Sequence, residues 1–193
     1  MIKAGIEYIN SKLAVLNYFE KSFGLCEIIS KGDKTFPAEY LHNGEYKQIN
    51  NFDTYNGVSY LRKNGDISIS DVENTLEACG ILSSINIPMK LVLIIPRKKL
   101  DCDDNYSEDV IAQTIMRELL TKDVALKQTL NARQAKIQID SYSTNSISIL
   151  NEEYSKYPKK DINYKYAYLS LNIIITAIVT QDCLTRDCYG QYS

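Results

Sequence analysis

The stretch YAYLSLNIIITAIVT, residues 166–180, alternates two sets of side chains along most of its length. One set is apolar throughout and consists of Leu169, Leu171, Ile173, Ile175, Ala177 and Val179. The other begins polar and becomes apolar, and consists of Tyr168, Ser170, Asn172, Ile174, Thr176 and Ile178. Side chains of a β-strand point to opposite faces with a period of two, so the pattern predicts a long strand. Its second apolar face favours a central strand, or a strand covered by a partner.

Two further segments alternate in the same way. Over residues 85–95 the apolar positions are Ile85, Ile87, Met89, Leu91, Leu93 and Ile95, and the run stops at Pro96. A shorter segment places Ala135, Ile137 and Ile139 on one face and Lys136, Gln138 and Asp140 on the other. Both segments are predicted to be strands, the first with one buried face.

Helical spacing is clearest at the N-terminus. Apolar residues recur there in steps of three and four, at Ile2, Ile6, Ile9, Leu13, Leu16 and Phe19. This spacing predicts an amphipathic helix over residues 2–23 that ends at Gly24. Ser107 is a candidate N-cap for a second helix reaching about Lys122. Shorter helices are predicted over 71–80, 124–132 and 144–155.

Residues 25–70 predict short strands joined by tight turns. The turns are Lys31–Lys34, His42–Gly44 and Lys63–Asp66, and the last is expected to join strands 58–62 and 67–70 as a hairpin. The polar stretch 50–57 is expected to project as a loop. We therefore expect one α+β domain over 1–193, with a β-meander or arm at about 25–70. Its mainly antiparallel sheet would carry the N-terminal amphipathic helix and one or two further helices.

Composition excludes several classes of protein. The 193 residues are 45% hydrophobic and 24% charged, which is ordinary for a globular chain. Twenty-two basic and twenty-four acidic residues nearly balance, which disfavours tight binding to DNA phosphates. The longest apolar run is shorter than the ~20 residues of a membrane span, and charged residues interrupt the N-terminus, so a soluble protein with no membrane contact is expected.

The cysteines and the histidine argue against a structural zinc site. Five scattered cysteines without a Cys-x-x-Cys pair fit a reducing compartment, and His42 is the single histidine. Cys183 and Cys188 could form a redox pair, although reduced thiols are the simpler interpretation. His42 could act as a general base, but a polar residue beside a turn is usually just exposed. We therefore expect no cofactor and no catalytic role for these residues.

Two acidic patterns resemble metal sites. The loop residues Asp101, Asp103, Asn105, Ser107 and Asp109 alternate like EF-hand ligands, but Tyr106 replaces the required Gly and Ala112 the final Glu. A solvated acidic loop explains that pattern better. Asp33, Glu45 and Lys47 have the outline of a metal-dependent nuclease site, in which the carboxylates hold Mg²⁺. Glu-x-Lys occurs by chance in many proteins, however, and alternating charge is also typical of an exposed strand, which is the simpler interpretation.

Fifteen tyrosines are present, several of them near the C-terminal strand. Tyrosine is enriched at subunit interfaces because it combines apolar area with a hydrogen-bonding tip. The alternative is the compositional bias of an AT-rich genome, which would also raise Lys, Asn and Ile. Both explanations stay open.

The order of the expected elements resembles that of the tail-terminator and neck-ring proteins of tailed bacteriophages. The resemblance is carried by Met89–Ile95 leading into the helix 107–122, by Lys136–Ser141, and by the closing strand Tyr166–Thr180. It covers most of the chain as a pattern, without fixed motifs, and the meander at 25–70 is longer than in the smallest members. The composition suits a phage of an AT-rich host, such as the crAss-like phages of Bacteroides.

This resemblance implies a structural virion protein, made in the host cytoplasm, and not an enzyme. It would form a homo-oligomeric ring that joins head to tail, contacts other neck, portal or tail proteins, and lets DNA pass without specific binding. Asp101, Asp103, Asp104 and the 50–57 loop are candidates for lumen or neighbour contacts. The alternatives are a metal-dependent nuclease of a mobile element that uses Asp33, Glu45 and Lys47, and a small binding module for a ligand or peptide.

Overall fold

The computed structural model describes residues 1–41, 44–49, 55–72, 82–100, 107–120, 124–154 and 165–180. Its helices are α1 (Ile2–Ala14), α2 (Glu108–Leu120), α3 (Val124–Thr129) and α4 (Ser146–Glu153), with a 3-10 turn η2 (Arg97–Lys99). Its strands are β1 (Lys21–Lys31), β2 (Lys34–Tyr40), β3 (Tyr46–Gln48), β4 (Val58–Lys63), β5 (Ser68–Asp71), β6 (Leu82–Pro96), β7 (Gln134–Ser143) and β8 (Tyr166–Thr180).

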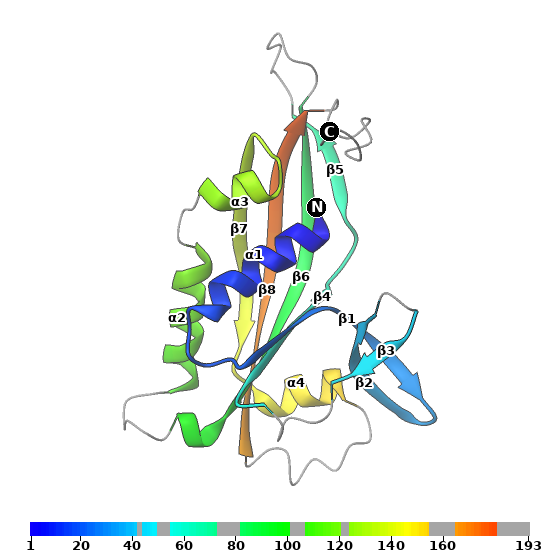
Figure 1. Ribbon diagram of the computed structural model, residues 1–193, viewed down its shortest axis with the longest axis vertical. Coiled ribbons are helices and arrows are strands. Elements are labelled where there is room, and N and C mark those ends of the chain that lie inside the picture. The colour runs from blue at the N-terminus through cyan, green and yellow to red at the C-terminus, as the bar shows by residue number, and fades with distance from the viewer. Residues whose placement is uncertain are drawn as a thin grey trace, which may run out of the picture.

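The strands of the described part form one mixed sheet. Their order is β3-β2-β1-β4-β6-β8-β7, and β5 pairs with β6 beyond the end of β4. All neighbours are antiparallel except β1 and β4, which run parallel. The predicted α+β class with a mainly antiparallel sheet and an N-terminal helix is therefore confirmed (Figure 1). No described helix is long and apolar enough to span a membrane.

β6 and β8 form the centre of the fold. They pair without a register shift along their whole length, from Leu82–Thr180 to Pro96–Tyr166. Their odd-numbered side chains share one core with the apolar stripes of α1, α2 and α3. Because β8 lies between β6 and β7, it is a central strand, as its second apolar face favoured.

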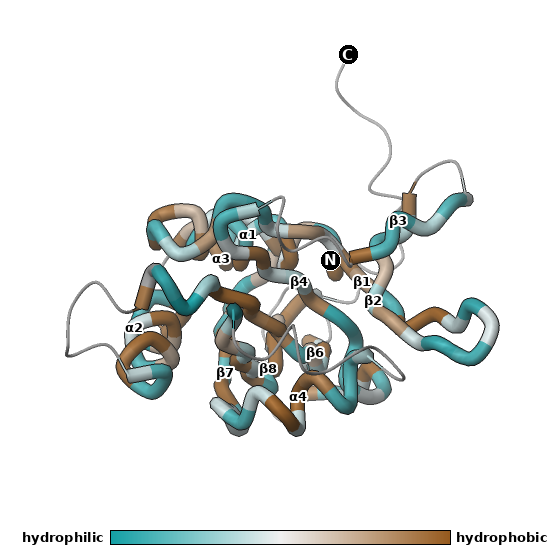
Figure 2. The backbone as a smooth tube through the Cα atoms, turned by 90° about the horizontal axis from the view of Figure 1, so that it is seen from below, coloured by the Kyte–Doolittle hydropathy of each residue, from teal (hydrophilic) through white to brown (hydrophobic). Residues whose placement is uncertain are grey.

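The opposite face of the sheet is only partly covered. Near one end, Val92 and Tyr168 pack with Ile149 and Leu150 of α4 in a second core. Figure 2 shows the central strands between α1 and α3 on one side and α4 on the other. Toward the other end, no described helix lies over this face, where Ile174 is half-buried. On the second face of β6, the residues from Lys90 onward are buried, which the simple alternation did not predict.

The N-terminal helix is shorter than predicted. α1 ends at Ala14 instead of residue 23, and Gly24 lies within β1 and caps no helix. The backbone N–H groups of Glu20 and Lys21 donate to the carbonyl of Gly57 at 3.0 and 3.2 Å, which brings the chain into the sheet as β1. Leu16 and Phe19 still pack against the core, so the apolar periodicity continues although the helix does not.

The predicted hairpin between 58–62 and 67–70 was wrong. β4 and β5 do not pair with each other, because both run antiparallel to β6 along the same edge. Their ladder is interrupted opposite Pro88, whose carbonyl accepts from the N–H of Asn64 at 3.1 Å. Since N and O of one strand residue point to the same edge, the missing N–H of Pro88 faces this gap.

The other two predicted turns join β1, β2 and β3 into an antiparallel meander. The β1–β2 turn contains Gly32 with a φ of 65°. β2 pairs with β3, as the predicted hairpin requires, although His42 and Asn43 lie outside the described residues. We call the part of this meander beyond the pairing with β4, residues 26–49, the arm, and it projects from one side of the molecule (Figure 1).

The remaining helices agree with the sequence in position but are shorter. Ser107 is confirmed as a cap, because its Oγ accepts from the N–H of Val110 at 3.3 Å. Asn145 caps α4 by accepting from the N–H of Ser148 at 3.1 Å. α3 ends at Thr129 rather than at 132, and most of the predicted helix 71–80 lies outside the described residues, with Asp71 itself ending β5.

Candidate functional site

The three residues of the possible nuclease site do not all converge. Asp33 lies in the turn at one end of the arm, and Lys47 of β3 pairs with Glu39 of β2. Glu39 is six residues from Asp33 along an extended strand, which separates their backbones by roughly 20 Å. Glu45 directly precedes β3, two residues before Lys47 and at the end of the arm away from Asp33. Asp33, Glu45 and Lys47 therefore do not form a site in which two carboxylates and a lysine surround one ion.

Several other candidates fall outside the described residues. These are His42, the loop residues Asp101, Asp103, Asp104 and Asn105, and the pair Cys183 and Cys188. Ser107 and Asp109 are described, and both belong to the start of α2. Cys26 is a buried free thiol. Burial, together with the charges of Glu39 and Glu153, raises the pKa of Cys26 well above its ordinary value. Across the described ranges, no group of three Asp, Glu, His or Cys side chains is placed to hold a metal ion.

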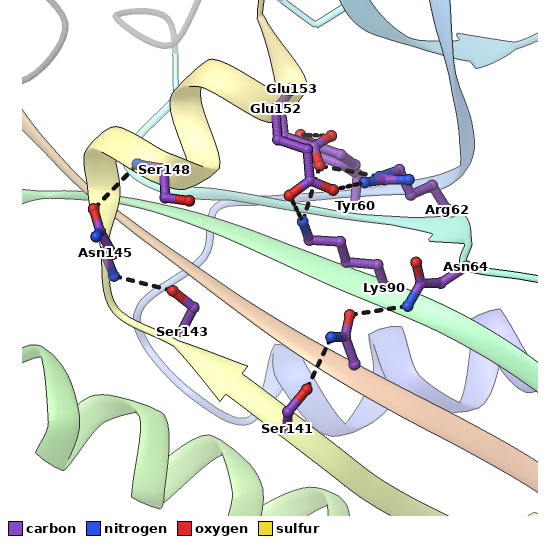
Figure 3. A network of polar contacts seen from close by, with 11 residues as sticks. Tyr60, Arg62, Asn64, Lys90, Ser141, Ser143, Asn145, Ser148, Glu152 and Glu153 are labelled. Atoms are coloured by element: carbon purple, nitrogen blue, oxygen red, sulfur yellow. Dashed lines mark hydrogen bonds and ion pairs between the residues drawn. The ribbon is translucent and has the colours of Figure 1, made fainter.

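Within the described residues, a network of four charged side chains lies between α4 and the sheet (Figure 3). Glu152 and Glu153 end α4, while Arg62 of β4 and Lys90 of β6 lie opposite them. Arg62 and Lys90 are cross-strand partners, so their side chains leave the same face of the sheet. Two acids and two bases make the network neutral.

Glu153 is the buried centre of this network. Its side chain is 0% exposed. Its Oε2 accepts from the hydroxyl of Tyr60 at 2.9 Å, and its Oε1 lies 3.0 Å from Nε of Arg62 and 3.5 Å from Nζ of Lys90. Both oxygens are thus occupied by groups of the protein itself. A catalytic carboxylate needs an oxygen directed at its substrate, so this arrangement indicates an anchor for α4 instead.

The same helix also holds the base of the arm. The hydroxyl of Tyr154, which follows α4, donates to the carbonyl of Ile49 at 2.9 Å. Tyr60 donates to Glu153 one residue earlier, and burial with the nearby Tyr154 and Glu153 raises the pKa of Tyr60 well above its ordinary value. Tyr60 therefore stays a neutral donor at physiological pH. α4 joins the central strands to the arm through these bonds.

Glu152 is expected to make the stability of the protein depend on pH. Burial would raise its pKa, but the hydrogen bond and charge of Lys90 and the charge of Arg62 outweigh burial and lower it. The contribution of Glu152 to the free energy of unfolding is therefore fully present above its pKa in the unfolded chain, about 4.3. It is lost as the pH falls through its lower pKa in the folded protein. We expect the stability difference between wild type and Glu152→Gln to shrink between about pH 5 and pH 3. Urea unfolding at each pH measures it, and a constant difference would contradict the assignment.

The uncovered end of the sheet carries rows of polar side chains. Thr176 donates to Oδ1 of Asn86 at 2.9 Å, and Asn86 donates to Ser68 at 3.4 Å. A second row joins Asn64, Asn172 and Ser141 through bonds of 3.1 and 2.9 Å (Figure 3). These groups satisfy one another across the strands, and the first row lines an open groove together with Asp66 and Lys136. This is the usual composition of an antiparallel sheet face in contact with water.

The arm presents an exposed aromatic pair. Tyr40 and Tyr46 are cross-strand partners, 56% and 44% exposed, with ring centroids 5.4 Å apart in an edge-to-face arrangement. The hydroxyl of Tyr46 donates to Oε2 of Glu27 at 3.2 Å, and the charge of Glu27 raises the pKa of Tyr46. We call Glu27, Tyr40 and Tyr46 together the arm patch.

The outer side of α2 presents a second exposed surface. Val110 and Leu120 are 39% and 51% exposed, and the exposed Arg117 lies between them in the sequence. Positions seven and three residues apart fall on the same side of a helix, so the three side chains form one stripe, the α2 stripe. Figures 1 and 2 both place α2 and the arm on opposite sides of the molecule.

Neither the α4 network nor the two exposed surfaces were predicted from the sequence. A signal for the network was present, because Lys90 interrupts the apolar run from Ile87 to Ile95. A lysine in a buried strand requires an acidic partner. Nothing in the order of residues identified Glu153 as that partner, since an acidic pair at a helix end is ordinarily solvated.

Comparison with known proteins does not assign the chain to a family. No family model matches it, and no curated protein is significantly similar to it.

Proposed function

We propose that the chain is a structural virion protein that forms a ring at the neck or tail terminus of a bacteriophage. The ring joins head to tail and lets DNA pass through its centre. In this proposal the subunit is made in the host cytoplasm and becomes part of the virion, where it contacts neck, portal or tail proteins. The proposal is also supported by the order of elements along the sequence, which resembles that of tail-terminator and neck-ring proteins.

One observation carries the proposal: the arm patch and the α2 stripe, two of the exposed surfaces in the described part of the chain, lie on opposite sides of the subunit. The arm patch projects on one side, and the α2 stripe lies on the other (Figure 1). A contact between different surfaces of identical subunits is heterologous, and it closes into a ring when the rotation permits. Two equal surfaces would instead support a simple twofold dimer.

The charge of the chain agrees with this role. The formal net charge is −2, and the uncovered sheet face is lined mainly by uncharged polar groups that bond to one another. Specific or tight DNA binding would need an excess of basic groups against the phosphates. A neutral passage lets DNA move without being held.

The mass of the purified protein in solution tests the proposal. We expect a defined oligomer larger than a dimer by multi-angle light scattering, with a mass that stays constant over roughly a tenfold dilution. A parallel assay incubates the protein with DNA and Mg²⁺, using Lys47→Ala as the control. A monomer that cuts DNA in a Lys47-dependent manner would overturn the proposal and favour the nuclease.

A further inference from the structure

We infer that the arm patch of one subunit docks on the α2 stripe of the next copy, with Arg117 of that copy packed against the exposed rings of Tyr40 and Tyr46 and paired with Glu27. The inference rests on the proposed ring and names the contact that closes it.

The chemistry of the arm patch defines its ligand as a cation on an apolar support. Tyr40 and Tyr46 offer two exposed rings at an angle to each other, and Glu27 sets a carboxylate beside them. Aromatic faces attract cations within about 6 Å, most often a guanidinium group, which also stacks on a ring. The carboxylate adds the geometry of a charge-assisted pair with arginine.

The α2 stripe has the complementary chemistry. Arg117 provides the guanidinium, with apolar Val110 and Leu120 on the same side of the helix. An arginine flanked by exposed apolar side chains matches two tyrosines flanked by a glutamate in both charge and hydrophobicity. Tyr and Arg are also among the residues that are enriched at energetically dominant interface positions.

The placement of the two surfaces makes the contact repeatable. Because the arm projects away from the side of the molecule that carries α2, one subunit cannot join its own two surfaces (Figures 1 and 2). Each copy therefore offers its arm to one neighbour and its α2 to another. The hydrogen bonds of Tyr60 to Glu153 and of Tyr154 to the carbonyl of Ile49 connect the base of the arm to the central strands through α4.

A charge-exchange experiment tests the contact. We expect Glu27→Arg and Arg117→Glu each to weaken assembly by about tenfold or more, because like charges then meet at the contact. Combining both substitutions restores the opposite charges, and we expect assembly to return to within about threefold of wild type. Light scattering over a dilution series measures each variant, and far-ultraviolet circular dichroism checks that it is folded.

Two matched control variants test whether a charge reversal on any exposed surface weakens assembly. Glu7→Arg on α1 and Lys127→Glu on α3 change the same charges on exposed positions of other surfaces and are expected to leave assembly unchanged. Tyr40→Ser removes exposed aromatic area without changing a charge and is expected to weaken assembly as well.

The outcomes separate this inference from the proposed function. If the wild type forms rings that neither single substitution weakens, the docking contact is wrong while the ring stands. If the single substitutions weaken the ring but the double variant is no better, Glu27 and Arg117 do not meet, and the inference is overturned. If the wild type is monomeric at all concentrations, both the inference and the proposed function fail.

Discussion

Gly57→Ala is expected to prevent stable folding. A Cβ atom at this position would lie 2.0 Å from the carbonyl oxygen of Tyr18, which is backbone and cannot swing aside. Gly57 also has a φ of 102°, a conformation that side chains other than glycine rarely adopt. Its carbonyl accepts the N–H groups of Glu20 and Lys21, where the chain leaves the helical layer and enters the sheet.

The expected cost combines two effects. Strain at a positive φ costs on the order of 1–3 kcal/mol, and overpacking against fixed atoms costs about 1–3 kcal/mol more. We therefore expect a loss of about 3 kcal/mol or more in the free energy of unfolding, measured by urea denaturation, or failure to obtain folded protein.

Gly32→Ala is the matched control for Gly57→Ala. Gly32 has a φ of 65°, but nothing lies within 4 Å of an added Cβ. It isolates the conformational cost, which should be about 1–2 kcal/mol. Equal losses in the two variants would show that Gly57 and Tyr18 do not approach closely, and would contradict the path of the chain over residues 15–21.

Glu153→Ala is expected to destabilise the protein by about 3–5 kcal/mol, because Arg62 and Lys90 would keep their charges in a site without the buried carboxylate. The hydroxyl of Tyr60 would also lose its acceptor. Glu152→Ala is the natural comparison, since Glu152 is the adjacent residue, contacts the same two bases, and is 50% exposed. Exposed ion pairs contribute about 1 kcal/mol or less.

Urea unfolding of the two alanine variants at neutral pH measures this contrast. Tyr60→Phe, which removes one neutral donor to Glu153, should fall between them at about 1–2 kcal/mol. If Glu152→Ala costs as much as Glu153→Ala, the burial of Glu153 is not what holds α4 against the sheet.

The centre of the fold could be predicted from the sequence because its signal is strictly periodic. Alternation over 85–95 and 166–180 located β6 and β8, and Ser107 located the start of α2. The end of α1 could not be located, because Leu16 and Phe19 pack on the core from an irregular segment and keep the helical spacing. The prediction of a β4–β5 hairpin was wrong for a related reason. Asn-Gly indicates a turn, but it does not indicate whether the next strand folds back on the previous one or pairs further along a longer neighbouring strand.

The candidate site was less accessible to prediction because it depends on contacts between distant residues. Arg62 and Glu153 are 91 residues apart, and neither is unusual in its local sequence. Tyr40 and Tyr46 flank a turn, so their pairing follows from the hairpin, but their exposure depends on the arm standing away from the sheet. Asp33, Glu45 and Lys47 were grouped by residue type, and the extension of the arm separates Asp33 from Lys47.

Electron microscopy of the purified wild-type protein tests the central claim, assembly into a ring, most directly. We expect end-on views of closed rings with a central opening, in which the arm of each subunit reaches the neighbouring α2. Fields that contain only single subunits or twofold dimers, at concentrations where the protein is folded, would contradict it.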